Sequence, residues 1–274
     1  MLKNPFGVYL YFLLRNDYSW SLLSDKEKAY IQKLNIQHNS FRDDYLTPEK
    51  NEKNWQSFKD IEEKENKDIT RLFLHTALLD LNPEKVLEIG PGAGYLSHMV
   101  CKHRTVSLYD SIDINEFFSN YINNSINNSF VDGSLKHNHY VGNASTFNNN
   151  KKYDMIIILN AVHHIPDRFI FFDNLIRHLS DDGVIVAVDP SHYLKRILLL
   201  THKIISNGML KKSYYMHGNN LSTHHMCSEG EYSKIVKQHN MRISSIEFNH
   251  NKLINIGPFK KYFSSQIGVV LRKK

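Results

Sequence analysis

One short stretch constrains the fold most, because three glycines at alternate positions follow directly behind an aliphatic run. The run VLEI, residues 86–89, has the composition of a buried β-strand, and Gly90, Gly92 and Gly94 come after it. A helical pattern then continues to about His103. Glycines at such a turn let the backbone tighten and approach a ligand where a side chain would collide. Free N–H groups at the helix start add a polar cradle. The stretch predicts a strand–turn–helix unit that holds a nucleotide-like ligand.

The spacing of these glycines argues against two common nucleotide sites. A nicotinamide fingerprint needs G-x-G-x-x-G, but here the third glycine comes one residue early and Tyr95 stands in its place. A phosphate-binding P-loop needs a Gly-Lys-Ser/Thr ending, which is missing. Glu88 lies two residues before the first glycine. Its charge would lie near the amine or sulfonium of a cationic cofactor, which favours that ligand over a pyrophosphate.

The rest of the chain predicts an α/β fold. Short aliphatic runs alternate with helical stretches at Lys85–Ile89, Thr105–Tyr109, His139–Val141, Tyr153–Leu159 and Val184–Val188. Two more runs, Arg242–Phe248 and Gln266–Leu271, follow a last helix. This order predicts a doubly wound, seven-stranded and mostly parallel sheet that ends in an antiparallel hairpin edge. The Asn-rich segment 115–138 is expected to be a polar surface excursion outside the core.

With these elements in order, residues 82–191 resemble the class I S-adenosylmethionine-dependent methyltransferases of the small-molecule type. The first motif of that family, E-x-G-x-G-x-G, is matched by Glu88 to Gly94. The resemblance implies a Rossmann-like fold, S-adenosylmethionine as cofactor, and in-line attack of an acceptor nucleophile on the sulfonium methyl. It also implies that the first motif binds the cofactor through Glu88, Gly90, Pro91, Gly92 and Gly94.

Later motifs of the family imply further cofactor contacts. Asp110 is expected at the end of the second strand, where the family places an acid that accepts hydrogen bonds from both ribose hydroxyls. Asp113 is a nearby rival, but it falls beyond the expected strand end. Asn143, followed by Ala144, occupies the position where many members carry an Asp for the adenine amino group. This departs from the family pattern, although an amide oxygen can accept the same bond.

The fourth motif and its surroundings supply the remaining candidates. The sequence YDMIIILNAVHHIPD, residues 153–167, resembles the family's fourth strand and its ending, which implies that Asn160 and Ala161 lie beside the cofactor.

Catalysis can be mostly positioning, so a base is needed only if the acceptor begins protonated. His163, His164 and His192 follow strand ends and are the candidates. For the first two, the competing interpretation is that they pack against the sheet or cap the next turn. No histidine pair has metal-ligand spacing, so no metal is predicted.

Missing motifs narrow the acceptor to a small molecule, either anionic or lipid-like. LNAVHH replaces the NPPY-type sequence of amino-methylating nucleic-acid enzymes after the fourth strand.

We expect residues 1–80 to form a helical extension over the acceptor pocket and 81–274 to form the cofactor-binding domain. Residues 193–227, after the fifth strand, are expected to be a helical cap insertion.

Charge leaves an alternative function open. The formal net charge is +6, and residues 193–274 contain 14 basic and 3 acidic side chains. A nucleic-acid-binding, methyltransferase-like protein would use this block, although the aromatic and basic interleaving of a dedicated binding module is missing.

The basic amphipathic stretch 193–210 is also compatible with peripheral membrane contact or with an ordinary surface helix. No run approaches the roughly 18 apolar residues of a membrane span. With only Cys101 and Cys227, a cytoplasmic location with reduced thiols is expected. The oligomeric state is not indicated.

Overall fold

A computed structural model describes most of the sheet and the helices that cover it. The described residues are 21–29, 69–92, 94, 96–114, 116, 122–123, 126, 135–165, 168–191, 227, 229–250 and 264–274. The chain divides into two compact units, one of residues 1–45, 190–232 and 248–267 and the other of residues 46–189, 233–247 and 268–274. Almost all of the candidate site residues belong to the second unit.

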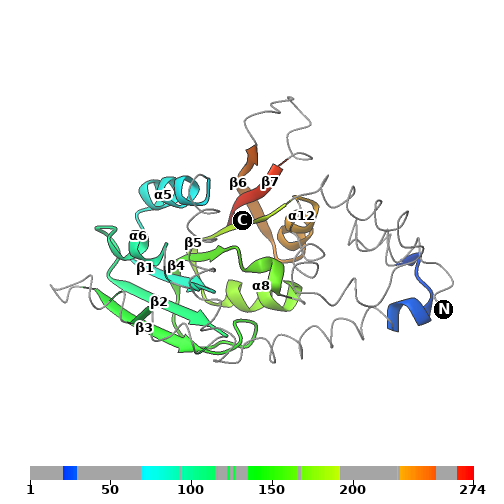
Figure 1. Cartoon of the computed structure of the whole chain (residues 1–274), viewed down its shortest axis with the longest axis horizontal. Helices are drawn as coiled ribbons and strands as arrows, with labels where there is room; N and C mark the ends of the chain where they lie inside the picture. The colour runs from blue at the N-terminus through cyan, green and yellow to red at the C-terminus, as the bar shows by residue number, and fades with distance from the viewer. Residues whose placement is uncertain are drawn as a thin grey trace, which may run out of the picture. The chain divides into compact units, whose positions relative to one another are not determined.

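Seven strands form one sheet in the order β3-β2-β1-β4-β5-β7-β6 (Figure 1). Their bounds are β1 Lys85–Ile89, β2 Leu108–Asp113, β3 Lys136–Val141, β4 Tyr153–Leu159, β5 Leu179–Pro190, β6 Met241–His250 and β7 Ser264–Lys273. The pairs β1–β2, β1–β4, β2–β3 and β4–β5 are parallel. The predicted α/β class, with a mostly parallel sheet and an antiparallel C-terminal part, is confirmed.

The second strand was predicted too early in the chain. Instead of ending at residue 109 or 110, β2 begins at Leu108 and runs to Asp113. The carboxyl half of β2 contains polar side chains, which are typical of a loop. In the structure this half forms hydrogen bonds with neighbouring segments. Ser111 Oγ lies 2.8 Å from Nδ1 of His139 on β3, and Gly90 N donates to Ile112 O at 2.8 Å. Polar residues that are paired inside a sheet do not end a strand.

One face of the sheet packs under α5, Ile69–Leu81, and α6, Ser97–Cys101. Side chains alternate along each strand, so Val86 of β1, Tyr109 of β2 and Ile157 of β4 face these helices. Ile122 and Ile126 join the same core with 0% and 2% exposure. The prediction that residues 115–138 form a purely polar surface excursion is therefore wrong, because these two isoleucines lie one helical turn apart and bury their side chains.

The other face packs under α8, Arg168–Arg177, through Phe171, Phe172 and Leu175 (Figure 1). β5 begins before the predicted run Val184–Val188, and residues 180–183 form an irregularity inside it, where the register with β4 shifts. A short 3-10 helix, η1, spans Val162–His164 after β4, and α12 spans Glu229–Gln238 before β6.

Other predicted segments are described only in part. Ser24 precedes a short helix at residues 25–29, and its N–H and Oγ both donate to Glu27 Oε2, at 2.9 and 2.8 Å. Within the predicted helical extension, residues 1–80, the structure also describes most of α5, and residues 30–68 lie outside the described residues. The predicted cap 193–227 also lies outside them, except for Cys227. Within the described ranges, no helix is long and apolar enough to cross a membrane.

Candidate active site

The glycine turn has the backbone that its sequence predicts. Gly90, Gly92 and Gly94 have φ angles of +65°, +54° and +76°, in the left-handed region that residues with a Cβ avoid. A Cβ built on Gly90 would lie only 3.0 Å from Cβ of Ala161, which follows β4. Pro91 is buried, and its carbonyl accepts a hydrogen bond from Gly94 N at 2.9 Å. The turn after β1 therefore packs tightly against the segment that follows β4, at the carboxyl edge of the sheet.

The acid at the end of β2 is Asp113. Its Oδ2 accepts a hydrogen bond from Gly92 N at 3.3 Å, and the residue is 9% exposed. Its carbonyl accepts another from Gly142 N at 2.9 Å, which joins the loop after β3. Asp113 thus contacts the glycine turn through its side chain and the next loop through its backbone. The strand-end position that the sequence prediction gave to Asp110 belongs to Asp113.

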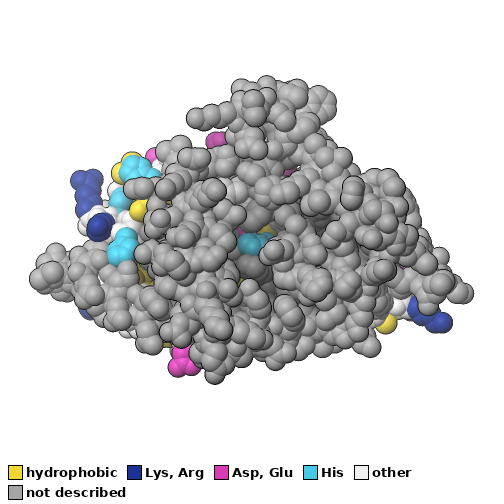
Figure 2. Space-filling model, viewed as in Figure 1, with side chains coloured by type: hydrophobic (Ala, Val, Ile, Leu, Met, Phe, Trp, Pro, Cys, Tyr) yellow, Lys and Arg dark blue, Asp and Glu magenta, His cyan; other side chains and the backbone are white. Residues whose placement is uncertain are grey.

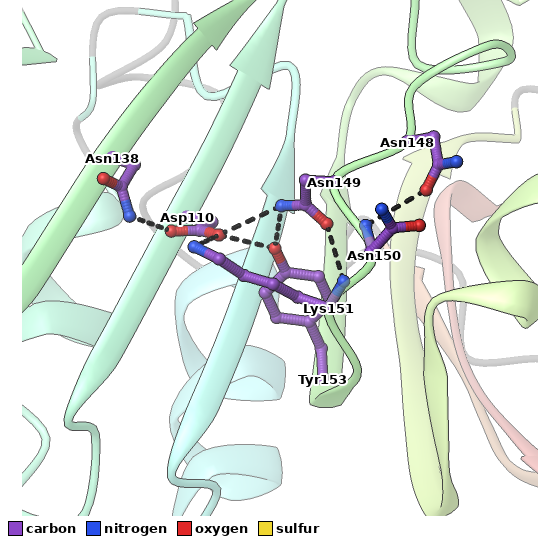
Figure 3. A network of polar contacts seen from close by, with 7 residues as sticks. All are labelled: Asp110, Asn138, Asn148, Asn149, Asn150, Lys151 and Tyr153. Carbon is purple, nitrogen blue, oxygen red and sulfur yellow. Dashed lines mark hydrogen bonds and ion pairs between the residues drawn. The ribbon is translucent and has the colours of Figure 1, made fainter.

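Asp110 instead lies inside the sheet, and its carboxylate is 0% exposed (Figure 3). Asp110 Oδ1 accepts from Asn138 Nδ2 at 2.7 Å. Its Oδ2 accepts from Tyr153 OH at 2.5 Å, Lys151 Nζ at 2.8 Å and Asn149 Nδ2 at 3.2 Å. Four side chains of the protein itself therefore donate to this buried carboxylate. The prediction that Asp110 ends the second strand is wrong, since three more strand residues follow it. Its predicted contact with the cofactor is not tested by these bonds.

Two neighbours of Asp110 respond to its charge. Partial burial disfavours the ammonium form of Lys151, but the hydrogen bond and charge of Asp110 outweigh it and raise the pKa of Lys151. Burial, with the hydrogen bond to Asp110, raises the pKa of Tyr153. Both side chains therefore remain protonated donors at neutral pH.

Glu88 forms a separate buried network on the other face of the sheet. Its Oε2 accepts from Ser97 Oγ of α6 at 2.8 Å and from Tyr109 OH of β2 at 2.6 Å. Burial raises the pKa of Glu88, the two hydrogen bonds lower it, and the charge of Asp113 raises it further, so the net shift is upward. These contacts tie β1, β2 and the helix after the turn together. The predicted contact of Glu88 with the cofactor is not tested by them.

The remaining cofactor candidates lie at the same edge of the sheet. Asn143 is exposed, and its Oδ1 accepts from Ser145 N at 2.9 Å in a local turn, while the carbonyl of Ala144 accepts from Asn174 Nδ2 at 2.9 Å. Asn160 follows β4 with φ +53°, a left-handed conformation that asparagine tolerates better than most residues. Its N–H donates to Val188 O of β5 at 2.7 Å.

One of the three catalytic candidates is described in full. His163 Nδ1 lies 2.9 Å from Oδ1 of Asp189, and the N–H of His163 donates to the same oxygen at 3.1 Å. His163 is 6% exposed and Asp189 0%. Asp189, which the sequence interpretation did not single out, ends the VIVAV run that marked the fifth strand. The backbone of His164 is described but not its side chain, and His192 lies outside the described residues.

The histidines do not assemble a metal site in the part of the chain that is described. No group of three or more His, Cys, Asp or Glu side chains there could hold a metal ion. His137 and His139 share one face of β3, and Nε2 of each is buried without a hydrogen-bond partner. Burial lowers the pKa of His137 and lowers that of His139 to about 4, with the charge of His137 contributing to the latter.

The residues at the carboxyl edge fit the cofactor that the sequence resemblance implies. The left-handed turn brings Gly90 so close to the segment after β4 that any Cβ on this residue would meet Ala161. Asp113 places a carboxylate at the end of the adjacent strand, against the turn. Ligands of doubly wound folds bind at this edge of the sheet, where the glycine turn and a strand-end acid meet.

Comparison with known proteins identifies the family. The family model of a methyltransferase domain matches residues 60–246. No curated protein sequence gave a match. Among solved structures, the plantazolicin methyltransferase BamL, in complex with a triazolic desmethylPZN analogue and SAH, is 15% identical with a TM-score of 0.59. The match covers 90% of this chain and 98% of BamL.

Two further structures have the same fold. The plantazolicin methyltransferase BpumL, in complex with SAH, is 15% identical over 90% of this chain and 99% of its own, with a TM-score of 0.57. An S-adenosylmethionine-dependent methyltransferase from Clostridium acetobutylicum is 14% identical over 80% and 98%, with a TM-score of 0.56. The chain belongs to the methyltransferase-domain family and is an S-adenosylmethionine-dependent methyltransferase.

Proposed function

We propose that the protein methylates a small-molecule acceptor. The observation that carries this proposal is the junction of three chain segments at the carboxyl edge of the sheet: the glycine turn, the end of β2 at Asp113, and the segment after β4 at Ala161. S-adenosylmethionine supplies a methyl group that its cationic sulfur already activates, so the task of the chain is mainly to bind and orient. The missing NPPY-type sequence and the plantazolicin methyltransferases among the similar folds support an acceptor other than a nucleobase.

In this proposal Asp113 accepts the ribose hydroxyls, the role that the family motif had suggested for Asp110. A carboxylate accepts charge-assisted hydrogen bonds, which are about twice as strong as neutral ones. Gly92 N already orients Oδ2 of Asp113 at the edge where ligands of this fold bind. Glu88, Gly90, Pro91, Gly92, Gly94, Asn143, Ala144, Asn160 and Ala161 keep their proposed cofactor contacts.

The experiment is a calorimetric titration of Asp113→Asn with S-adenosylmethionine and with S-adenosylhomocysteine. The amide keeps an acceptor for Gly92 N but removes the charge, so both ligands should bind about 10- to 150-fold more weakly, a loss of about 1.5 to 3 kcal/mol. Asp182→Asn is the matched control, because Asp182 is exposed on β5. Unchanged affinity of the Asp113 variant would remove Asp113 from the site, and no binding by the native protein would remove the proposal itself.

We also propose His163 as the proton acceptor for substrates that enter protonated. A carboxylate that holds Nδ1 of a histidine fixes the tautomer and orientation of the ring, as in general-base catalysis elsewhere. Oδ1 of Asp189 contacts Nδ1 of His163 in this way. The same oxygen also accepts a hydrogen bond from the backbone N–H of His163 in η1. His164 and His192 remain candidates without a described side chain.

The base role predicts a pH-dependent defect. His163→Gln should lower methyl transfer to an acceptor found by metabolite screening by about 100-fold near pH 7, and raising the pH should recover part of it, because the acceptor then loses its proton unaided. Rates measured from pH 6 to 9 would check this. An equal loss at every pH would mean that His163 only supports the turn.

Several parts of the sequence interpretation remain proposals. Covering of the acceptor pocket by residues 1–80 and 193–227 is one, and deletion of 193–227 followed by separate cofactor and acceptor binding assays would test it. Cytoplasmic location is another, which cell fractionation would test. Nucleic-acid binding by the basic C-terminal block gains no support from the described residues, and a salt titration of RNA binding would detect it.

A further inference from the structure

A second concave site lies along the loop between β3 and β4. A cavity of about 540 Å³ is lined by this loop, from Ser145 to Lys152, and by the carboxyl-terminal turn of α8. Lys151 and Lys152 precede β4, whereas the candidate cofactor residue Asn160 follows it. A seven-residue strand spans about 20 Å, so the lysines lie at the opposite end of β4 from Asn160, while Ser145 borders the candidate cofactor residue Ala144. The volume is within the range of small-molecule sites, about 300 to 1,000 Å³.

The lining of this cavity is basic and rich in hydrogen-bond donors. Lys151, Lys152 and Arg177 contribute three cations, no carboxylate lines the cavity, and the other lining residues are hydroxyl, amide and imidazole side chains. An apolar ligand would find no apolar side chain there to contact. A ligand with several anionic oxygens would be matched by cations and by neutral donors together.

The present partners of two cations are weak competitors for such a ligand. Arg177 pairs with Asp173 on the same helix, but the two side chains are 68% and 52% exposed. Exposed pairs of this kind contribute little free energy, so Arg177 can turn to an anion at small cost. Lys152 Nζ donates to the backbone carbonyl of Arg177, which joins the loop before β4 to the end of α8.

The third cation is held in place by the buried network of Asp110 (Figure 3). Lys151 Nζ lies 2.8 Å from Asp110 Oδ2, and the N–H of Lys151 donates to Asn149 Oδ1 at 3.2 Å. Asn150 adopts φ +58°, and its N–H donates to Asn148 Oδ1 at 3.1 Å. The turn before β4 is therefore fixed by its own side chains, which limits the ordering that a ligand would have to impose.

We propose that this cavity binds a small molecule bearing one or two phosphate groups. Phosphate oxygens accept from lysine, arginine, hydroxyl and amide donors alike, and a phosphate carries enough negative charge to match three cations. The cavity is adjacent to the turn that holds Ala144, because Asn174 lines it and donates to the carbonyls of Ala144 and Phe147 at 2.9 and 2.8 Å. The inference is independent of the proposed methyl acceptor.

The test uses the full chain and inorganic pyrophosphate, with orthophosphate as a second probe, in calorimetry at low ionic strength. Pyrophosphate should bind at one site, and Lys152→Ala/Arg177→Ala should weaken it by about tenfold or more. The matched control is Lys102→Ala/Arg104→Ala, which removes the same two residue types from exposed positions after α6. Figure 2 shows cationic and histidine side chains at the edge of the molecule where α5 and α6 lie, away from α8.

Each outcome of these titrations either supports or overturns the proposal. Binding that is lost in the Lys152/Arg177 variant and kept in the control supports the proposal. Equal loss in both variants, or no binding of either probe, overturns it. A ten-nucleotide single-stranded DNA that binds more tightly than pyrophosphate, and is lost in the same variant, would overturn the small-molecule assignment in favour of a nucleic-acid backbone. None of these measurements involves S-adenosylmethionine, so failure here leaves the methyltransferase proposal unaffected.

Discussion

The two parts of β2 place their acidic residues in different surroundings. In its amino half, Asp110 is fully buried and accepts hydrogen bonds from four side chains. At its carboxyl end, three residues later, Asp113 accepts a backbone N–H of the glycine turn. Side-chain hydrogen bonds tie the carboxylate of Asp110 to its neighbours in the sheet, whereas the carboxylate of Asp113 is tied to the backbone of the glycine turn. The position of an acid along a strand therefore decides which part of the protein it contacts.

The largest effect that would test this comparison is on stability. Asp110→Asn leaves Lys151 without its charged partner and places an amide among donors, so we expect it to lower the free energy of unfolding by about 3 kcal/mol. Urea unfolding followed by circular dichroism would measure it, and Asp182→Asn should stay within about 0.5 kcal/mol of the native protein. A stable Asp110 variant that binds S-adenosylmethionine poorly would reverse the roles assigned to Asp110 and Asp113.

A smaller effect concerns the turn that meets Asp113. Gly90→Ala must adopt φ +65° and place its Cβ 3.0 Å from Ala161, so it should cost about 2 kcal/mol in stability and weaken cofactor binding. Gly142→Ala is the control, because a Cβ there meets nothing within 4 Å. Thermal unfolding with and without S-adenosylhomocysteine would compare them. If both variants behave alike, the close approach of Gly90 to Ala161 is not required.

The smallest expected effect depends on pH and concerns Glu88. Because burial raises its folded-state pKa above the ordinary 4.5, the unfolded chain releases this proton more readily. The contribution of Glu88 to stability is therefore present below about pH 4.5 and is lost as pH rises through the folded pKa. Glu88→Gln lacks this titration, so its stability relative to the native protein should increase from pH 5 to pH 8.

The same variant tests the predicted contact between Glu88 and a cationic cofactor. Loss of affinity for S-adenosylmethionine but not for S-adenosylhomocysteine, whose sulfur carries no charge, would show that Glu88 senses the sulfonium. A relative stability that does not change with pH would contradict the buried, proton-binding role.

Sequence patterns identified the strands that are mostly aliphatic. β1 and β4 have the bounds that the sequence predicted, although Glu88 lies within β1 and Asp154 within β4. The sequence patterns failed for the bounds of β2 and β3. Ser111 and the histidines are residue types typical of loops and surfaces, and Asp110 was expected to end its strand. Those residues are paired with one another across the two strands, at 2.7 Å between Asn138 and Asp110 and 2.8 Å between Ser111 and His139. Such pairs join residues 28 positions apart, which no local pattern shows.

The sequence by itself determined the alternation of strands and helices and the position of the glycine turn, because hydrophobic periodicity and glycine spacing act locally on the backbone. Its resemblance to the methyltransferase family indicated the cofactor. Only the tertiary structure decided which acid stands at the end of β2, that Asp189 holds His163, and that three cations line a cavity at the other end of β4. The reason is physical: whether a polar side chain is a ligand or a structural bond depends on which distant donors reach it once the sheet has formed.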